Sequence, residues 1–210
     1  MIAFIHHAPT GGAVPRLVRV LRWAAEHGID GVVLAVGAET AAATVAALAD
    51  DADPGVPNRS SPRILAVFDA PAQCDLGGAF VDARAWLTEG AVVVLDAGAP
   101  LGFDLRALLV EHHQSPAIVT IALVPAECGE PGAPRADVDR SGRVLGLCSE
   151  GAAQDDQPAV DGCLVVETGL LSGLAGQPRP LHVWRDLVPY VLGRGGVVGG
   201  YRVSPVPATA

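Results

Sequence analysis

Short apolar runs that alternate with amphipathic helical patterns constrain the fold of this chain more than any other feature. The runs at residues 2–5, 31–37, 64–69, 91–96 and 117–125 are typical of buried strands. They lack the polar alternation of a half-exposed strand, which indicates strands covered on both faces. Strands separated by helices favour parallel pairing, because each crossover returns the chain to the same end of the sheet. We therefore expect an α/β fold with three layers, α/β/α, around a mainly parallel central sheet.

Helical periodicity fills the intervals between these strands. In residues 15–27 the apolar positions recur on one face of a helix, and Arg16 lies on the opposite face. Gly28 ends this helix. Asp104 is a good N-cap for a following helix. Further helices are expected at 39–50, 77–87, 105–113 and 181–193, the last with Leu181, Trp184, Leu187, Val188 and Val191 inward.

The second half of the chain has a different pattern. Residues 135–150 predict a hairpin with its turn at residues 140–142. Strands are expected at 163–168, followed by a short helix, and at 197–204, while 51–63, 126–136 and 149–160 have the composition of loops. Neither an internal repeat nor a domain boundary is evident, so residues 1–210 are interpreted as one domain.

Composition excludes several classes of function. The net charge of -9 argues against nucleic acid as the main partner, since binding the phosphate backbone needs a surplus of basic groups. Half of the residues are hydrophobic, yet no apolar run is long enough to span a membrane, and the first residues do not resemble a signal peptide. The four cysteines form no CxxC pair, so we expect reduced thiols in a cytoplasmic protein.

Lysine is absent from the whole sequence, and all 14 basic residues other than histidine are arginine. Every mechanism that needs a lysine side chain is therefore excluded. A GxSxG elbow and a GxGxxG loop after a strand are also absent, which argues against a serine hydrolase and a dinucleotide-binding domain.

The predicted strand ends nominate candidate site residues, because ligands of parallel sheets bind beyond the carboxyl ends of the strands. These ends carry His6, His7, Asp69 and Asp96. The histidine pair is either a base or anion contact in the site or an ordinary loop pair. Asp96 is either a metal ligand or the cap of the next turn. His112 and His113 end a helix, where an imidazolium suits the helix dipole.

Several longer stretches carry a family resemblance. Residues 20–37, 92–113, 119–125, 136–147 and 182–203, in this order and spacing, resemble the sugar-phosphate nucleotidyltransferases, the enzymes that join an NTP to a sugar 1-phosphate. The resemblance covers most of the chain. It implies a Rossmann-like sheet of the nucleotidyltransferase type, and it implies that Gly77 and Gly78, in a partly kept glycine turn, accept a nucleobase.

The reactive residues of that family are largely missing. The loop at residues 6–12 is short and lacks the Arg and Lys that the family places around the phosphates. The family's metal turn reads Asn-Gly-Asp, whereas this chain has Asp96-Ala97-Gly98, so a glycine stands where the Mg²⁺ carboxylate is expected. Arg16 is the nearest arginine after the loop, but its outer position on the first helix argues against a phosphate contact.

Three functions remain open. The first is a degenerate nucleotidyltransferase-like protein that binds a nucleotide, sugar phosphate or related polar metabolite, or serves as a partner subunit or homo-oligomer, without catalysing nucleotidyl transfer. The second is a divergent, active sugar-1-phosphate nucleotidyltransferase that uses Asp96 for its metal. The third is a new enzyme on this scaffold that uses His6, His7 or Asp96. The first is preferred, with substrate contacts at His6, His7, Gly77, Gly78 and Asp96 and with no metal or cofactor.

Overall fold

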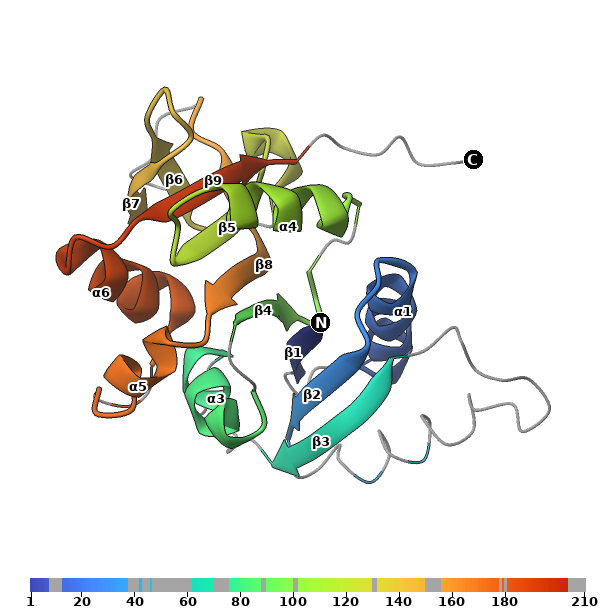
Figure 1. Ribbon diagram of the computed structural model, residues 1–210. Coiled ribbons are helices and arrows are strands. Elements are labelled where there is room, and N and C mark those ends of the chain that lie inside the picture. The colour runs from blue at the N-terminus through green and yellow to red at the C-terminus, as the bar shows by residue number, and fades with distance from the viewer. Residues whose placement is uncertain are drawn as a thin grey trace, which may run out of the picture.

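A nine-stranded mixed sheet with helices on both faces forms the centre of the computed structural model (Figure 1). The structure describes residues 1–7, 13–37, 42, 46, 62–69, 76–87, 90–99, 102–129, 132–149, 156–177, 179 and 181–203. The strands are β1 (Ile2–His7), β2 (Gly31–Val36), β3 (Arg63–Asp69), β4 (Ala91–Asp96), β5 (Val119–Val124), β6 (Arg135–Val138), β7 (Val144–Cys148), β8 (Ala159–Glu167) and β9 (Val198–Arg202). The α-helices are α1 (Ala13–Glu26), α3 (Leu76–Asp82), α4 (Leu105–Gln114), α5 (Leu170–Leu174) and α6 (Val188–Gly193).

The strand order β3-β2-β1-β4-β8-β5-β9 joins two parallel groups through one antiparallel strand. Strands β1 to β4 pair in parallel, as do β5 and β9, whereas β8 runs antiparallel to both β4 and β5. The hairpin of β6 and β7 joins β8 where Arg135 faces Ala159. The expected three-layer α/β fold with a mainly parallel sheet is therefore confirmed.

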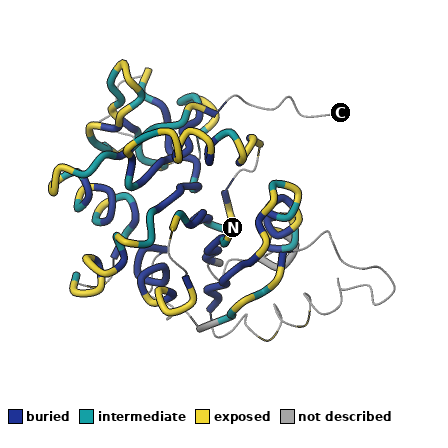
Figure 2. Tube along the Cα trace, viewed as in Figure 1, coloured by how far each residue is buried: buried dark blue, intermediate teal, exposed yellow. Residues whose placement is uncertain are grey.

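Two apolar cores lie on the two faces of the sheet. Figure 2 shows the burial of each residue along the chain, with long buried stretches in the central strands. One core contains the inward faces of α1 and α4, and the other contains α3, α6 and the chain leading into α6. Successive residues of a strand alternate between the cores, as Phe4 and Ile5 do. A strand packed on both faces needs apolar residues at every position, which explains the unbroken apolar runs.

Most expected elements are present close to their predicted bounds. Asp104 caps α4 by accepting a hydrogen bond from the backbone N–H of Arg106 at 2.9 Å, and Gly28 ends α1 with φ of +82°. Residues 140–142 form the expected hairpin turn, in which Asp139 accepts hydrogen bonds from Ser141 and Arg143. Cys128, Cys148 and Cys163 are free cysteines in the structure, and Cys74 lies outside the described residues. The helix expected at 39–50 lies largely outside the described residues.

The structure corrects two predicted boundaries. Strand β8 begins at Ala159, four residues before the expected start, so the end of the predicted loop 149–160 belongs to the sheet. The helix expected at 181–193 begins as a π-helix, Val183–Leu187, before α6. In the part of the chain that the structure describes, no helix is both long and apolar enough to cross a membrane.

A bulge in β8 explains why its first half was not recognised as a strand. Ile121 of β5 faces Leu164 and Leu123 faces Val160, so Ala122 alone lies opposite three residues of β8. Gly162, in the middle of these three, has φ of +72°, a conformation that favours glycine. The bulge interrupts the apolar pattern with Asp161 and Gly162, and it lies where the ladder between β4 and β8 ends, at Leu95 and Cys163.

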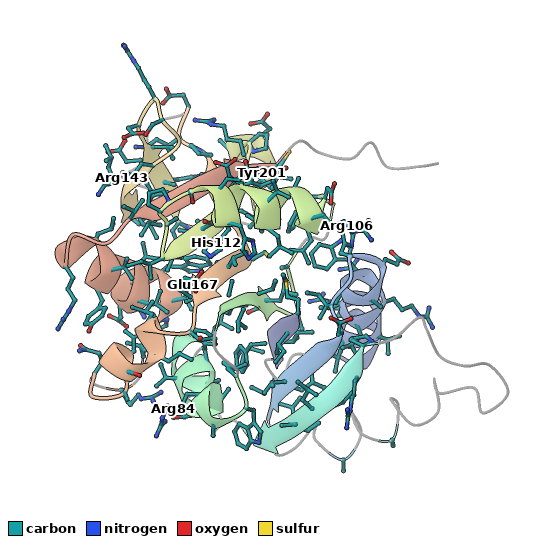
Figure 3. All side chains as sticks on the ribbon, viewed as in Figure 1. Arg84, Arg106, His112, Arg143, Glu167 and Tyr201 are labelled. Carbon is teal, nitrogen blue, oxygen red and sulfur yellow. The ribbon has the colours of Figure 1, made fainter. Side chains whose placement is uncertain are left out.

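A buried histidine ties α4 to the sheet (Figure 3). His112 is 2% exposed, and its Nδ1 lies 2.8 Å from the hydroxyl of Thr120 on β5. Its Nε2 lies 3.2 Å from a carboxylate oxygen of Glu167 on β8. Burial lowers the pKa of His112, with a small contribution from His113, while Glu167 opposes the shift. His112 lies in the last turn of α4, as expected, and it also connects this helix to β5 and β8.

A second connection holds the start of α3 against the chain that leads into α6. The guanidinium of Arg179 donates to the carbonyl of Gly78 at 2.7 Å and to the carboxylate of Asp82 at 2.9 Å. A Cβ added to Gly77 would lie 2.5 Å from the carbonyl oxygen of Leu181. The absence of a side chain at Gly77 therefore allows the two segments to touch.

Acidification is expected to destabilise the protein through His112. An imidazole in the unfolded chain takes up its proton near pH 6.5, whereas the buried ring takes it up at lower pH. The unfolded state therefore binds more protons as the pH falls below 6.5, and the free energy of unfolding decreases. Urea unfolding at pH 7.5, 6.5 and 5.5 should show a smaller decrease for His112→Gln than for the wild type. The control is His113→Gln, which changes an exposed ring; an equal loss in all three proteins would contradict the prediction.

Substitution of Gly77 is expected to destabilise the fold although alanine is the better helix former. Alanine gains up to about 1 kcal/mol over glycine inside a helix. A Cβ 2.5 Å from a backbone carbonyl forces the two segments apart, and such overpacking costs about 1–3 kcal/mol. Chemical denaturation should therefore give a lower free energy of unfolding for Gly77→Ala. Gly102→Ala, where a Cβ meets nothing within 4 Å, should stay within about 0.5 kcal/mol of the wild type.

Candidate functional site

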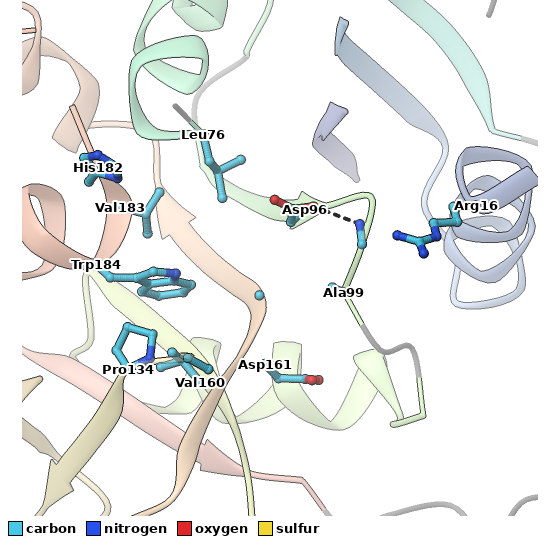
Figure 4. Close-up of a pocket in the computed structure, with 13 residues that line it drawn as sticks. Arg16, Leu76, Asp96, Ala99, Pro134, Val160, Asp161, His182, Val183 and Trp184 are labelled. Carbon is cyan, nitrogen blue, oxygen red and sulfur yellow. Dashed lines mark hydrogen bonds between the residues drawn. The ribbon is translucent and has the colours of Figure 1, made fainter. Parts of the chain in front are cut away.

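A cavity of about 330 Å³ lies at the carboxyl end of β4, beside the bulge of β8 (Figure 4). Its volume is within the range of small-molecule sites. Its walls come from α1, the start of α3, the turn after β4, the segment before β6, the bulge and the start of the π-helix. The lining residues are Arg16, Leu76, Asp96, Gly98, Ala99, Ala133, Pro134, Val160, Asp161, Gly162, His182, Val183 and Trp184.

The cavity has a charged side and an apolar side. Figure 4 shows Arg16 and Asp96 on the side of α1 and the β4 turn, and Trp184, Val183 and Leu76 on the opposite side. Asp161 is a buried carboxylate, 4% exposed, in the floor made by the bulge. The cavity therefore offers one guanidinium and two carboxylates on one side and mainly apolar side chains on the other.

Asp96 shapes the turn that borders the cavity. Its Oδ1 accepts a hydrogen bond from the backbone N–H of Gly98 at 2.8 Å, and its carbonyl accepts one from Ala99 at 2.9 Å. The side chain therefore caps the turn, which was one of the two interpretations of Asp96, and it also lines the cavity. The predicted strand end thus lies at the candidate site.

The residues of this turn do not fit the Mg²⁺ site that the family resemblance implies. Gly98 has no carboxylate, and one oxygen of Asp96 is already engaged by the backbone. Among the described residues, no group of three or more His, Cys, Asp and Glu side chains could hold a metal ion. We therefore derive no catalytic step through a metal.

Of the other residues nominated from the sequence, His6, Gly77 and Gly78 are not among the lining residues. His6 is 7% exposed and is paired in register with Asp96 across β1 and β4. The side chains of His7 and Asp69 lie outside the described residues, and only their strand positions are known. Gly77 and Gly78 are buried in the first turn of α3, where Gly77 is covered by Leu181; their neighbour Leu76 does line the cavity.

Two lining residues were not nominated from the sequence. Arg16 lies on the exposed face of α1, as expected, and the first turn of this helix borders the cavity, so that face supplies part of the wall. Trp184 packs against the core, as expected, but it is only partly buried and also contributes to the cavity. Helical periodicity identifies which face packs on the sheet; it does not show that another face borders a cavity.

Arg135, at the start of β6, is partly buried, and its guanidinium donates to the carbonyl of Ala126 at 2.7 Å. It therefore fixes the segment after β5 to β6.

Comparison with known proteins places this architecture among solved folds. No protein-family model and no curated protein matches the sequence. HddC from Yersinia pseudotuberculosis matches with a TM-score of 0.68 and 12% identity over 96% of this chain and 89% of that chain, and it has also been crystallised with GMP-PN. The inositol-1-phosphate CTP transferase from T. maritima matches with a TM-score of 0.73 and 13% identity over 99% of this chain and 90% of that chain.

A third structure, from Bacillus anthracis and assigned as a glucose-1-phosphate thymidylyltransferase, was solved in complex with a sucrose. It matches with a TM-score of 0.73 and 14% identity over 98% of this chain and 88% of that chain. Identities this low show the shared fold and not a shared activity. The chain therefore has the fold of the sugar-phosphate nucleotidyltransferases.

Proposed function

We propose that this protein binds a nucleotide, sugar phosphate or related polar metabolite in the cavity beside β4, without catalysing nucleotidyl transfer. Three observations support binding. The fold is that of nucleotidyltransferases, a similar structure holds a nucleotide analogue, and the cavity lies at the carboxyl end of a parallel strand. Arg16 offers a guanidinium to an anionic ligand.

The turn after β4 lacks the groups that nucleotidyl transfer needs. Nucleotidyl transfer is an in-line attack on an α-phosphate, and metal ions and cationic side chains stabilise the charge that builds up on its oxygens. Here Gly98 has no carboxylate, and its backbone N–H donates a hydrogen bond to one carboxylate oxygen of Asp96. The sequence also has no lysine to replace the missing charge. Binding needs only complementarity to the ground state, so it survives losses that abolish catalysis.

A second candidate function is a divergent, active nucleotidyltransferase. The observation that favours it is that two carboxylates, Asp96 and Asp161, both line the cavity. Mg²⁺ often takes one or two protein carboxylates and completes its shell with substrate phosphates and water. Activity of this kind would require Mg²⁺ and would depend on Asp96.

The purified protein is expected not to make nucleotide sugars. Loss of one group that stabilises the transition state costs about 3 kcal/mol. Three such losses follow from the family resemblance: the absent lysine, the short loop at residues 6–12, and Gly98 in place of a carboxylate. Together they amount to roughly six powers of ten in rate. Pyrophosphate release from several NTPs with sugar 1-phosphates, in Mg²⁺ or Mn²⁺, should therefore equal that of a control without enzyme. Turnover near the roughly 10 s⁻¹ typical of enzymes would contradict this expectation.

Ligand binding is expected to be independent of metal. Thermal shift assays against NTPs, nucleotide sugars and sugar phosphates should give the same stabilisation in EDTA as in Mg²⁺. A ligand at a hundred times its Kd raises the free energy of unfolding by about 2.7 kcal/mol, a shift that is easily measured. Binding that needs Mg²⁺ and is abolished in Asp96→Ala would favour the second candidate instead.

A further inference from the structure

A second cavity, of about 340 Å³, lies at the carboxyl ends of the parallel strands β5 and β9. Among the described residues it shares no lining residue with the cavity beside β4. Its walls come from the end of β5 and the turn that follows, the segment before β8, and the end of β9. Ligands of parallel sheets bind beyond the carboxyl ends of the strands, and the volume is at the small end of the range of small-molecule sites.

Strand register brings the walls of the second cavity together. Arg202 of β9 is paired with Leu123 of β5. The next residue of β5, Val124, is paired on its other side with Ala159 of β8, and Asp156 precedes Ala159 by three residues. Segments that are far apart in the sequence therefore meet at one end of β5, and each contributes to the same cavity.

The second cavity has an apolar interior and a charged mouth. Glu127, Asp156 and Arg202 are the charged residues of its lining, and all three are exposed. The fully buried residues of the lining are all apolar: Leu123, Val124, Pro158 and Val203. This arrangement suits a small ligand that has an apolar side chain and carries its charged groups at one end.

The backbone around the second cavity is largely engaged within the protein. The carbonyls of Leu123, Pro125 and Pro158 each accept a hydrogen bond from a backbone N–H, at 2.8, 2.9 and 2.9 Å. The carbonyl of Ala126 accepts one from the guanidinium of Arg135 at 2.7 Å, which also fixes the turn after β5. None of the described lining residues has a hydroxyl or amide side chain. The three charged side chains are therefore the main polar groups that the cavity offers to a ligand.

These groups disfavour the ligand classes proposed for the cavity beside β4. Two carboxylates and one guanidinium give the mouth a net negative charge, which repels the dianion of a phosphate monoester. A sugar ring would bury hydroxyl groups in the apolar interior without partners, which costs free energy. A ligand that carries one positive and one negative group matches both signs of charge at the mouth.

We propose that the second cavity binds a free α-amino acid with an apolar side chain. The ligand carboxylate lies at Arg202, whose guanidinium matches a carboxylate in two parallel hydrogen bonds. The ligand ammonium, with its three N–H donors, lies at Glu127 and Asp156. The apolar side chain enters the interior at the ends of β5 and β9. This site is separate from the one under the proposed function and does not depend on it.

Four ligands test the role of each group. L-leucine carries all three groups, whereas 3-methylbutylamine lacks the carboxylate, 4-methylpentanoate lacks the ammonium, and glycine lacks the side chain. Isothermal titration near neutral pH should give an affinity for L-leucine at least tenfold higher than that for any of the other three ligands. The physical reason is that charge-assisted hydrogen bonds and apolar burial each add to binding.

Substitutions at the mouth should separate the two charged contacts. Arg202→Gln should lower the affinity for L-leucine at least tenfold and leave that for 3-methylbutylamine unchanged. The double variant Glu127→Gln, Asp156→Asn should lower the affinity for L-leucine at least tenfold and should not lower that for 4-methylpentanoate. Arg140→Gln is the matched control, because Arg140 is exposed and is not among the lining residues. Melting temperatures establish that each variant is folded.

Three results would overturn the inference. The first is the absence of saturable binding of L-leucine, L-valine and L-phenylalanine at millimolar concentrations. The second is L-leucine binding that Arg202→Gln leaves unchanged, or a loss in this variant that is equal for L-leucine and 3-methylbutylamine. The third is L-leucine binding that Asp96→Ala abolishes and Arg202→Gln retains, which would place the amino acid in the cavity beside β4. Failure of the proposed function would appear instead as a lack of nucleotide and sugar phosphate binding, whatever the result with L-leucine.

Discussion

The antiparallel strand β8 is the element on which the rest of the structure depends. It lies between β4 and β5, so it connects the parallel group β3-β2-β1-β4 to the parallel pair β5-β9. Most of its residues are buried, because cores cover both faces of the sheet around it. His112 reaches it from α4 through Glu167, and the β6–β7 hairpin joins it at Ala159. A change that displaces β8 would therefore separate both halves of the sheet and disturb the cavity.

The bulge in β8 links this architecture to the candidate site. Two extra residues opposite Ala122 end the regular ladder and bring Asp161 and Gly162 to the cavity. A side chain on Gly162 would lie 3.1 Å from the Cβ of Ala99, so the close approach of the bulge to the β4 turn relies on glycine. The shape of the floor thus follows from backbone geometry at Gly162 and Ala99. Asp161 adds a carboxylate to this floor, and Arg16 and Trp184 line the two sides of the cavity.

A scaffold of this kind can keep a binding cavity after losing a reaction. The apolar residues that form the sheet are needed for folding whatever the chain binds, because their burial supplies most of the stability. The groups needed for nucleotidyl transfer are few and lie in loops, such as the turn where the family resemblance implies a carboxylate and this chain has Gly98. These groups contribute little to folding, so they can be lost singly without disturbing the frame. The proposed function therefore depends on the residues that maintain the fold and the cavity, and it does not require the loop groups that nucleotidyl transfer needs.

The sequence by itself determined the layers and most of the elements. Unbroken apolar runs and helical periodicity report burial, and burial on both faces of a strand specifies a covered sheet. It also identified Asp96, because a strand end is a local feature that the sequence displays. The antiparallel direction of β8 was decided by tertiary structure, since its pairing partners are distant in sequence. The bulge was also decided there, because in the sequence alone Gly162 looks like the end of a strand. The contribution of Arg16 and Trp184 was likewise decided by tertiary structure: periodicity gives the face that packs on the sheet, but only the placement of whole helices around β4 decides which other face borders a cavity.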